Sequence, residues 1–287
     1  MKAIFIINPI SGVGKQRLIE ALISKKIAPS IEYVVRKTEY ANHGAEIAKE
    51  FVNRVDAVIA IGGDGTVLEI GSALTGTSTA LGIIPTGSGN GLARNLGIPI
   101  SIENAIGLIN NHSIKTIDTG TVNDQVFLGT LGVGFDAHIT KCFAEYGKRG
   151  FWSYIKLIFR EYFSYKPQLF KLTIDGKSFE KRAWILCVAN SAHYGNGAII
   201  SPNSSTNDGI FEVCALKKPT IFQVPLFVFR FFTGSIHKSS LMSRESGKEI
   251  VIQNNFELFH RDGEPTLSTK ALEIKINPLS LKVIVPA

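Results

Sequence analysis

Short apolar runs alternate with longer amphipathic segments along the first part of the chain. Buried strands are predicted where such a run is bounded by turn-forming residues, at residues 3–7, 31–35, 55–61 and 81–84. Helices are predicted where apolar side chains recur at helical spacing, at residues 16–24 and 41–53, and a further short helix at residues 92–96. This alternation predicts a parallel sheet that is covered by helices.

The pattern changes near residue 121. From there the chain is rich in short strand-like runs that Gly, Pro, Asn and Asp separate, which is typical of an antiparallel sandwich. The predicted strands lie at residues 170–174, 184–188, 209–213, 250–252, 256–259, 272–276 and 281–285. The fold class is therefore α/β plus β. We expect an α/β domain at residues 1–122 and a β-sandwich domain at residues 123–287.

Two apolar segments interrupt the second domain. Residues 151–163 read as a helix in which aromatic, aliphatic and basic residues are mixed, and residues 221–232 are strongly apolar. No Asp or Glu occurs between residues 213 and 244, although five basic residues do. This combination favours transient binding to an anionic membrane surface. The alternative is a buried core helix whose basic side chains reach water.

The composition is consistent with these domains, but it does not identify a binding partner. The chain has 287 residues, of which 45% are hydrophobic and 19% charged, and this suits one large or two ordinary domains. The net charge of +7 favours an anionic partner, but no nucleic-acid-binding motif occurs, so no nucleic acid is expected. No apolar run is long enough to span a bilayer, and the N-terminus does not look like a signal peptide. We therefore expect a cytoplasmic protein that associates peripherally with membranes.

The three cysteines point to the same compartment. Cys142, Cys187 and Cys214 are widely spaced, which fits neither a disulfide framework nor a zinc site. Each has apolar neighbours in the sequence, so we expect all three to be core residues in a reducing environment.

The stretch Gly62-Gly63-Asp64-Gly65-Thr66 follows a predicted strand and precedes a predicted helix. The N–H groups of such a turn, together with a helix N-terminus, favour an anionic ligand, so we interpret it as a phosphate cradle. The simpler alternative is a tight turn that binds nothing. Asp64 either holds a metal ion or organises the loop. Residues 8–15 and 85–91 form similar loops after two other strands, on the side where open α/β sheets bind ligands.

A nucleoside triphosphate also requires a divalent cation and therefore further carboxylates. Asp64, Asp208, and the pair Asp262 and Glu264 are the candidates. Each Asp-Gly pair has the alternative interpretation of a plain hairpin turn, and we assign Asp175-Gly176 to that class. The histidines are scattered and form neither a triad nor a ligand spacing.

Taken in order, these motifs resemble those of the diacylglycerol kinase catalytic-domain superfamily, which includes bacterial soluble lipid kinases and the sphingosine and ceramide kinases. The resemblance is carried by Asn8-Pro9-Ile10-Ser11-Gly12, Thr38 with His43 and Gly44, Gly62 to Thr66 with Glu69, Pro85 to Asn90, Pro202 to Gly209, and Asp262-Gly263-Glu264. The glycine-aspartate loop alone is shared with NAD kinases and phosphofructokinases. The ordered set covers nearly the whole chain and is far more specific.

The resemblance implies an ATP-dependent lipid kinase. It implies an N-terminal α/β nucleotide-binding domain like that of NAD kinases and diacylglycerol kinases, followed by a β-sandwich domain, with a cleft between them. There the γ-phosphoryl group of ATP is transferred to the hydroxyl group of a diacylglycerol-like or sphingosine-like lipid.

The resemblance also assigns roles to individual residues. The proton acceptor is Glu264 or Asp262, and Asp64 belongs to the same catalytic set. The implied ATP contacts are Asn8, Pro9, Ser11, Gly12, Thr38, Gly62, Gly63, Asp64, Gly65, Thr66, Glu69, Gly87 and Ser88. A Mg²⁺ ion is implied near Asp208, Ser205 and the carbonyl group of Ile210, and Lys156 falls near the point where the lipid enters.

The sequence departs from the family at three places that bear on the substrate. Asn207 replaces the first of two aspartates, Leu68 stands where bacterial members often carry Asn, and the loop Gly87-Ser88-Gly89-Asn90-Gly91 is closer to the sphingosine and ceramide branch. Two alternatives stay open: a kinase of a soluble substrate such as NAD, and a non-catalytic protein that binds a lipid or nucleotide. A homodimer also stays open.

Overall fold

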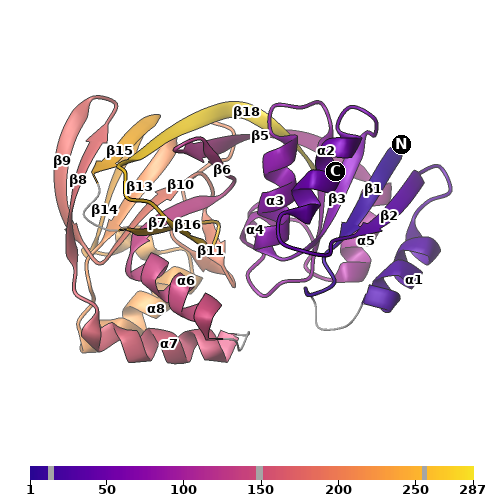
Figure 1. Cartoon of the computed structure of the whole chain (residues 1–287). Coiled ribbons are helices and arrows are strands. Elements are labelled where there is room, and N and C mark those ends of the chain that lie inside the picture. The colour runs from indigo at the N-terminus through magenta and orange to yellow at the C-terminus, as the bar shows by residue number, and fades with distance from the viewer. Residues whose placement is uncertain (12–15, 147–150, 254–256) are drawn as a thin grey trace. The chain divides into compact units, whose positions relative to one another are not determined.

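A computed structural model describes residues 1–11, 16–146, 151–253 and 257–287 of the chain. The chain divides into two compact units, one of residues Met1–Thr119 with Pro278–Ala287 and the other of residues Gly120–Asn277 (Figure 1). Each unit has the layered structure that its hydrophobic pattern predicts. Within the described helices, none is long and apolar enough to cross a membrane.

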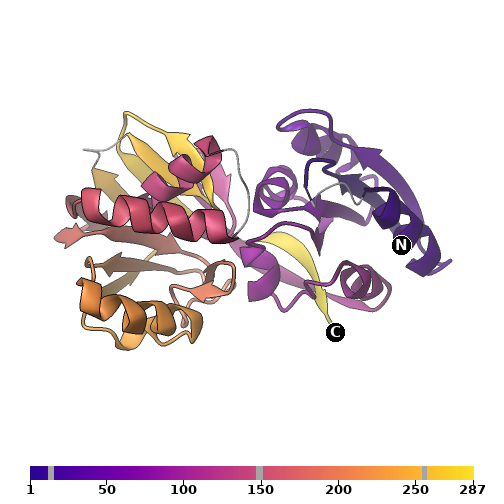
Figure 2. The same ribbon diagram turned by 90° about the horizontal axis from the view of Figure 1, so that it is seen from below.

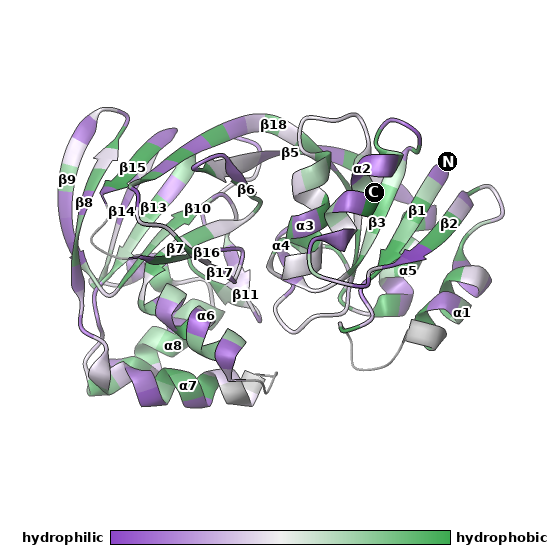
Figure 3. Cartoon of the chain, in the orientation of Figure 1, coloured by the Kyte–Doolittle hydropathy of each residue, from purple (hydrophilic) through white to green (hydrophobic). Residues whose placement is uncertain are grey.

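The first unit is built on parallel strands with helices around them. Its sheet has the order β2-β1-β3-β4-β18, and the neighbouring pairs of this run are parallel. Every residue of β3 and β4 is buried, as expected where both faces of a parallel sheet are covered. Figure 3 shows β3 in the green of hydrophobic residues. The elements are β1 (Lys2–Ile7), α1 (Gln16–Lys26), β2 (Glu32–Lys37), α2 (His43–Phe51), β3 (Ala57–Gly62), α3 (Asp64–Leu74), β4 (Ala80–Pro85), α4 (Gly91–Asn95) and α5 (Ile102–Asn110).

Two long strands, β5 (His112–Val122) and β18 (Leu272–Pro286), run from one unit into the other. The prediction of two separate strands at 272–276 and 281–285 was wrong, because both runs belong to the single strand β18, which continues through Pro278 and the left-handed Leu279, with a φ of 46°. The end of β18 pairs with β4, Val283 opposite Leu81, so the last ten residues of the chain belong to the first unit. An apolar run predicts a strand but does not say which neighbour it pairs with.

The second unit is a β-sandwich, as predicted. One antiparallel sheet has the order β14-β13-β10-β7-β16-β17, and β9, β8, β15 and the start of β18 form a second antiparallel run. Apolar side chains from both sheets pack into one core, including Phe127, Phe170, Phe211 and Phe259. The elements are β6 (Gln125–Phe127), β7 (Thr130–Gly134), β8 (Gln168–Ile174), β9 (Lys177–Ala183), β10 (Ile185–Ala189), β11 (His193–Gly195), β12 (Ala198–Ile199), β13 (Phe211–Leu216), β14 (Met242–Gly247), β15 (Glu249–Gln253), β16 (Leu258–Arg261) and β17 (Glu264–Leu267).

Three helices cover the outer face of one sheet of this unit (Figure 2). They are α6 (Phe135–Glu145), α7 (Phe151–Ser164) and α8 (Val224–Phe232), with the short 3₁₀ helices η1 (Ile221–Gln223) and η2 (Ile236–Lys238) flanking α8. Their apolar side chains form a second core with Trp184 and Cys187. Helix α7 was predicted, whereas α6 was not.

The cysteine prediction holds for two of the three residues. Cys187 and Cys214 are buried, but Cys142 on α6 is only half-buried, so its assignment to the core was wrong. Asp175 and Gly176 form the predicted hairpin turn, which joins β8 to the polar strand β9.

Candidate active site

Three loops at the carboxyl ends of β1, β3 and β4 lie at one edge of the first unit's sheet. These strands are neighbours and parallel, so their ends meet. The Asn8 side-chain amide donates to Thr66 Oγ1 at 2.9 Å, and the hydroxyl oxygens of Ser11 and Thr86 are 2.7 Å apart. These two hydrogen bonds join the loops that the sequence predicted to bind ATP. Gly12 lies outside the described residues.

Glycine is required where two of these loops meet. A Cβ atom on Gly87 would lie 2.6 Å from the Cα atom of Gly63, and a Cβ atom on Gly62 would overlap the side chain of Thr66. The backbones of the two loops therefore approach as closely as backbones can. Gly63 precedes the first turn of α3, which contains Gly65, and Ser88 is exposed in the third loop.

Asp64 holds the third loop against the second. Its Oδ2 atom accepts the Asn90 N–H group at 2.8 Å, and its Oδ1 atom accepts the Gly91 N–H group at 2.7 Å. Both N–H groups belong to the start of α4, so the carboxylate caps that helix. Of the two roles that the sequence left open, these contacts support the loop-organising one.

Glu69 and Thr38 make hydrogen bonds to elements next to the glycine loops. Glu69 Oε1 accepts the Asn42 N–H group at 3.0 Å, at the start of α2. Gly44 makes room for this carboxylate, because a Cβ atom there would lie 3.0 Å from Glu69 Oε2. Thr38 is buried after β2, and its N–H group donates to the Ile7 carbonyl oxygen at 3.0 Å. Glu69 therefore fixes the start of α2, and Thr38 fixes the end of β2 against β1.

The second unit carries the other two predicted catalytic carboxylates on one tight turn. Asp262 and Gly263, with φ values of 48° and 83°, join β16 to β17, and Arg261 pairs with Glu264 across the turn. Glu264 is exposed at the first position of β17.

The Asp262 carboxylate faces a neighbouring loop of the same unit. It accepts three backbone N–H groups, from Leu128 at 2.7 Å, Gly129 at 2.7 Å and Thr130 at 2.8 Å. Burial raises the pKa of Asp262, and the three hydrogen bonds act to lower it. The turn is thus fixed on the loop before β7.

A buried polar cluster behind this turn was missed by the sequence analysis. His260 Nε2 lies 3.1 Å from Asp136 Oδ2, and the Tyr194 hydroxyl group donates to the same oxygen. Both members of the pair are almost fully buried, with 4% and 3% of their side chains exposed. Asp136 follows no recognised motif, and His260 was dismissed as one of several scattered histidines. Only the fold brings them together.

The predicted metal-binding residues lie on one loop of the second unit, before β13. Ser205 Oγ donates to Asn207 Oδ1 at 2.8 Å, and Asp208 Oδ1 accepts the Ile210 N–H group at 3.2 Å. The buried hydroxyl oxygen of Ser204 has no hydrogen-bonding partner in the part of the chain that the structure describes. A loop of oxygen donors with an unsatisfied buried hydroxyl group fits a Mg²⁺ ion and its waters.

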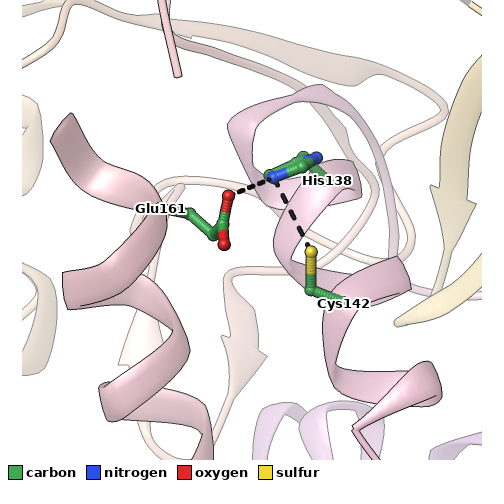
Figure 4. A group of neighbouring side chains, drawn as sticks. All are labelled: His138, Cys142 and Glu161. Atoms are coloured by element: carbon green, nitrogen blue, oxygen red, sulfur yellow. Dashed lines mark hydrogen bonds and ion pairs between the residues drawn. The ribbon is translucent and has the colours of Figure 1, made fainter. Parts of the chain in front are cut away.

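Another group of side chains has ligand-like spacing but unsuitable atoms for that ion (Figure 4). His138 Nε2 lies 2.9 Å from Glu161 Oε2 and 3.6 Å from Cys142 Sγ, between α6 and α7. Among the described residues, no other three His, Cys, Asp or Glu side chains lie this close together. Mg²⁺ prefers oxygen ligands, and burial raises the pKa of the Cys142 thiol. The His138–Glu161 pair therefore serves here to hold α7 against α6.

The apolar segments of the second unit have both a buried and an exposed side. Phe227 of α8 is buried, whereas Phe222 and Trp152 are 92% and 80% exposed. The other exposed large apolar residues of these segments are Phe159, Phe163, Ile221, Leu226, Val228, Phe229 and Phe232. Lys156 is exposed on α7 among them. The buried side of these helices fits the interpretation as core helices, and the exposed side leaves membrane binding as a prediction.

The chain resembles known proteins along nearly its whole length. Residues 2–122 match the diacylglycerol kinase catalytic domain, and residues 129–285 match the YegS C-terminal NAD kinase beta sandwich-like domain. A diacylglycerol kinase of Bacillus subtilis is 32% identical over 77% of this chain and 75% of its own length. One of Mycobacterium tuberculosis is 26% identical over 99% of this chain and 95% of its own length.

The same likeness holds for solved structures. The crystal structure of a candidate diacylglycerol kinase from Bacillus anthracis superimposes with a TM-score of 0.82 at 26% identity, covering 99% of this chain and 96% of that one. The resemblance drawn from the ordered motifs is thereby confirmed. The chain belongs to the family of diacylglycerol kinases and YegS-like lipid kinases.

Proposed function

We propose that this protein transfers the γ-phosphoryl group of ATP to the hydroxyl group of a lipid, with diacylglycerol as the first candidate. The observation that supports this most directly is the edge of the first unit, where three glycine-containing loops are joined by Asn8–Thr66 and Ser11–Thr86 hydrogen bonds. The relatives described above are named as diacylglycerol kinases, which favours a lipid over NAD as the substrate. The same names favour a catalyst over a non-catalytic binding protein.

The glycine loops supply the contacts for the triphosphate. The close approach of Gly63 and Gly87 leaves no room for side chains between the two loops. Backbone N–H groups are therefore the donors that we expect to bind the triphosphate. The N-terminus of α3 adds a favourable field for negative charge. Asn8, Pro9, Ser11 and Ser88 contribute side chains around this edge. The direct ATP contacts proposed for Thr38, Glu69 and Asp64 become supporting contacts, since their hydrogen bonds hold the loops and α2 in place.

Glu264 is the better candidate for the proton acceptor. The Asp262 carboxylate already accepts three N–H groups, and protonating it would weaken these hydrogen bonds. Glu264 is exposed on the adjacent strand end, where a substrate hydroxyl group has access to it. A base within reach of that hydroxyl group contributes about 10²–10⁴-fold in rate. Asp262 then serves to fix the turn that presents Glu264.

A Mg²⁺ ion would be held by Asp208, the Ser205 hydroxyl group and the Ile210 carbonyl group. Bound there, it supplies positive charge that supports phosphate binding and the local structure. Burial raises the pKa of Glu212, the Arg244 guanidinium group lowers it, and the charge of Asp208 raises it to a smaller extent. A divalent cation at Asp208 would offset that last, smaller repulsion. Asn207, which is neutral, leaves the loop with less charge than two aspartates would give.

The exposed apolar side chains of α7, η1 and α8 support a role in membrane contact. Phe222, Trp152 and Phe229 offer aromatic anchors, and Lys156 and Arg230 offer positive charge beside them. Aromatic anchors flanked by bases favour binding to an anionic lipid surface, from which a lipid substrate would be taken. We expect this association to be peripheral and transient.

The proposal is tested by a transfer assay with radiolabelled ATP on diacylglycerol, sphingosine, ceramide and NAD. We expect label in a lipid product, and a loss of about 10²-fold or more in kcat for Glu264→Gln with the KM for ATP nearly unchanged. Glu273→Gln, on the exposed side of β18, is the matched control and should retain activity. Phosphorylation of NAD and of none of the lipids would overturn the proposal.

A further inference from the structure

The buried pair of Asp136 and His260 lies directly behind the Asp262–Gly263 turn. Asp136 comes from the first turn of α6, and His260 comes from β16, two residues before the turn. The Gly263 N–H group donates to His260 Nδ1 at 3.4 Å. His260 therefore contacts the buried carboxylate with one ring nitrogen and the backbone of the turn with the other.

These contacts fix the state of the imidazole ring. Because Nδ1 accepts a hydrogen bond from the Gly263 N–H group, Nε2 is the ring nitrogen that donates, and its partner is Asp136 Oδ2 at 3.1 Å. The remaining Asp136 oxygen accepts the Ala137 N–H group at 2.9 Å, and the Tyr194 hydroxyl group completes the set. Every group of the cluster is thus satisfied, and the ring has one orientation.

The cluster fits only because residue 132 has no side chain. Gly132 lies on β7 opposite His260, and a Cβ atom at this position would overlap both Asp136 Oδ2 and His260 Nε2. A buried charge is costly unless it is paired, and an apolar pair of similar size is often at least as stable. Stability alone therefore does not explain why position 132 is a glycine that leaves room for a carboxylate and an imidazole.

The cluster accounts for one of several attachments of the same turn, another being the Asp262 N–H group, which donates to the Thr130 carbonyl oxygen at 2.8 Å. The Asp262 carboxylate is bound to the loop before β7, the Arg261 guanidinium group donates to the Val126 carbonyl oxygen at 2.7 Å, and Gly263 is held by His260. Glu264 is the next residue. We propose that Asp136 and His260 are positioning residues, which hold the turn so that the Glu264 carboxylate is presented in one direction. This inference rests on the proposed function, in which Glu264 is the proton acceptor.

His260→Gln separates positioning from folding. A glutamine side chain reaches Asp136 with its own Nε2 donor, but has no atom in place of Nδ1 to accept the Gly263 N–H group. We expect kcat to fall about 10-fold, since small misplacements of a catalytic group are costly, while the KM for ATP stays within about twofold. His112→Gln, at the start of β5 in the first unit, is the matched control and should leave both constants unchanged.

A double-mutant cycle with Glu264→Gln shows whether His260 acts through Glu264. Residues that act as one unit are strongly non-additive, so in the Glu264→Gln background the His260→Gln change should cost less than about twofold. An equal fold-loss in both backgrounds, or full activity of His260→Gln alone, would overturn the inference. If the wild type phosphorylates no lipid, it is the proposed function that fails.

The turn itself gives a readout that does not need activity. Amide hydrogen exchange of Gly263, followed by NMR, should be about 10-fold or more faster in His260→Gln than in the wild type and the His112→Gln control. Thermal unfolding measured in parallel should show all three proteins folded at the assay temperature. Unchanged exchange at Gly263 would mean that His260 does not hold the turn.

Discussion

A single methyl group at Gly87 tests whether the approach of two backbones builds the ATP site. Gly87 is not among the glycines with positive φ, so alanine costs nothing in backbone conformation there. Its Cβ atom would lie 2.6 Å from Gly63 Cα, whereas carbon atoms in contact lie about 3.5–4.0 Å apart. The second and third loops must therefore separate by about 1 Å. Overpacking of this kind costs about 1–3 kcal/mol in the free energy of unfolding.

The displacement should lower the catalytic efficiency with ATP more than it lowers the stability of the fold. Because a 1 Å misplacement of positioning groups can cost about 10²-fold, we expect kcat/KM for ATP to fall by about that factor in Gly87→Ala. Steady-state kinetics with varied ATP, and urea unfolding of the same protein, give the two quantities. Gly107→Ala is the control, because Gly107 lies inside α5 with no atom within 4 Å of an added Cβ.

Gly107→Ala should raise the free energy of unfolding by about 0.5–1 kcal/mol and leave the kinetics unchanged, since it replaces a helical glycine. The reasoning would be refuted if Gly87→Ala used ATP as the wild type does. It would also be refuted if both substitutions lowered kcat/KM equally, because the loss would then not depend on the contact with Gly63.

Three further changes test other parts of the structure. Asp64→Asn removes one of two charge-assisted hydrogen bonds at the start of α4 and should cost about 1.5–3 kcal/mol in urea unfolding, with a higher KM for ATP; unchanged stability would exclude the capping role. Asp175→Asn keeps the turn but weakens the hydrogen bonds from two consecutive backbone N–H groups, which lower the pKa of the Asp175 carboxyl group. The stability that the wild-type carboxylate adds should therefore be present at neutral pH and be lost as pH falls below about 3.8 through that lowered pKa. An equal stability difference between wild type and variant at pH 2 and pH 7 would contradict this. Phe222→Ser with Phe229→Ser should lower co-sedimentation with anionic vesicles at least about 10-fold, whereas Leu18→Ser on α1 should not; equal binding of both variants would remove α8 from the membrane surface.

The parts of the fold that could be predicted are those whose signal is local. The strands β3 and β4 are continuous apolar runs that end in glycine or proline, so both their existence and the loops after them could be predicted. The polar strand β9 could not, because its only apolar residues are Phe179 and Ala183 and only its pairing with β8 makes it a strand. Helix α6 was missed because its buried face begins at once after β7, within one apolar stretch.

The candidate site divides in the same way. Glycine loops after strands are visible in the sequence, because each motif is a few residues long. The Asp136–His260 pair is separated by 124 positions and depends on the order of β7 and β16 in the sheet. No spacing along the chain carries that information, so a buried histidine of this kind looks like any other until the strands are paired.

The four Asp-Gly pairs of the chain show how one local motif acquires different roles. Asp64, Asp175 and Asp262 each accept backbone N–H groups from a segment far away in the sequence, at α4, β15 and the loop before β7 respectively. In each case the carboxylate joins its own turn to another loop, and the glycine beside it lets that turn form. Asp208 differs, because the hydrogen bond that the structure gives it goes to Ile210 in its own turn, and its side chain is exposed. A carboxylate that joins two loops is already neutralised by N–H donors, so binding a cation would break those bonds, whereas Asp208 can bind one without such a loss. The sequence motif is therefore the same at all four positions, but the contacts favour Asp208 as the cation ligand and leave Asp64 and Asp262 as the residues that shape the site.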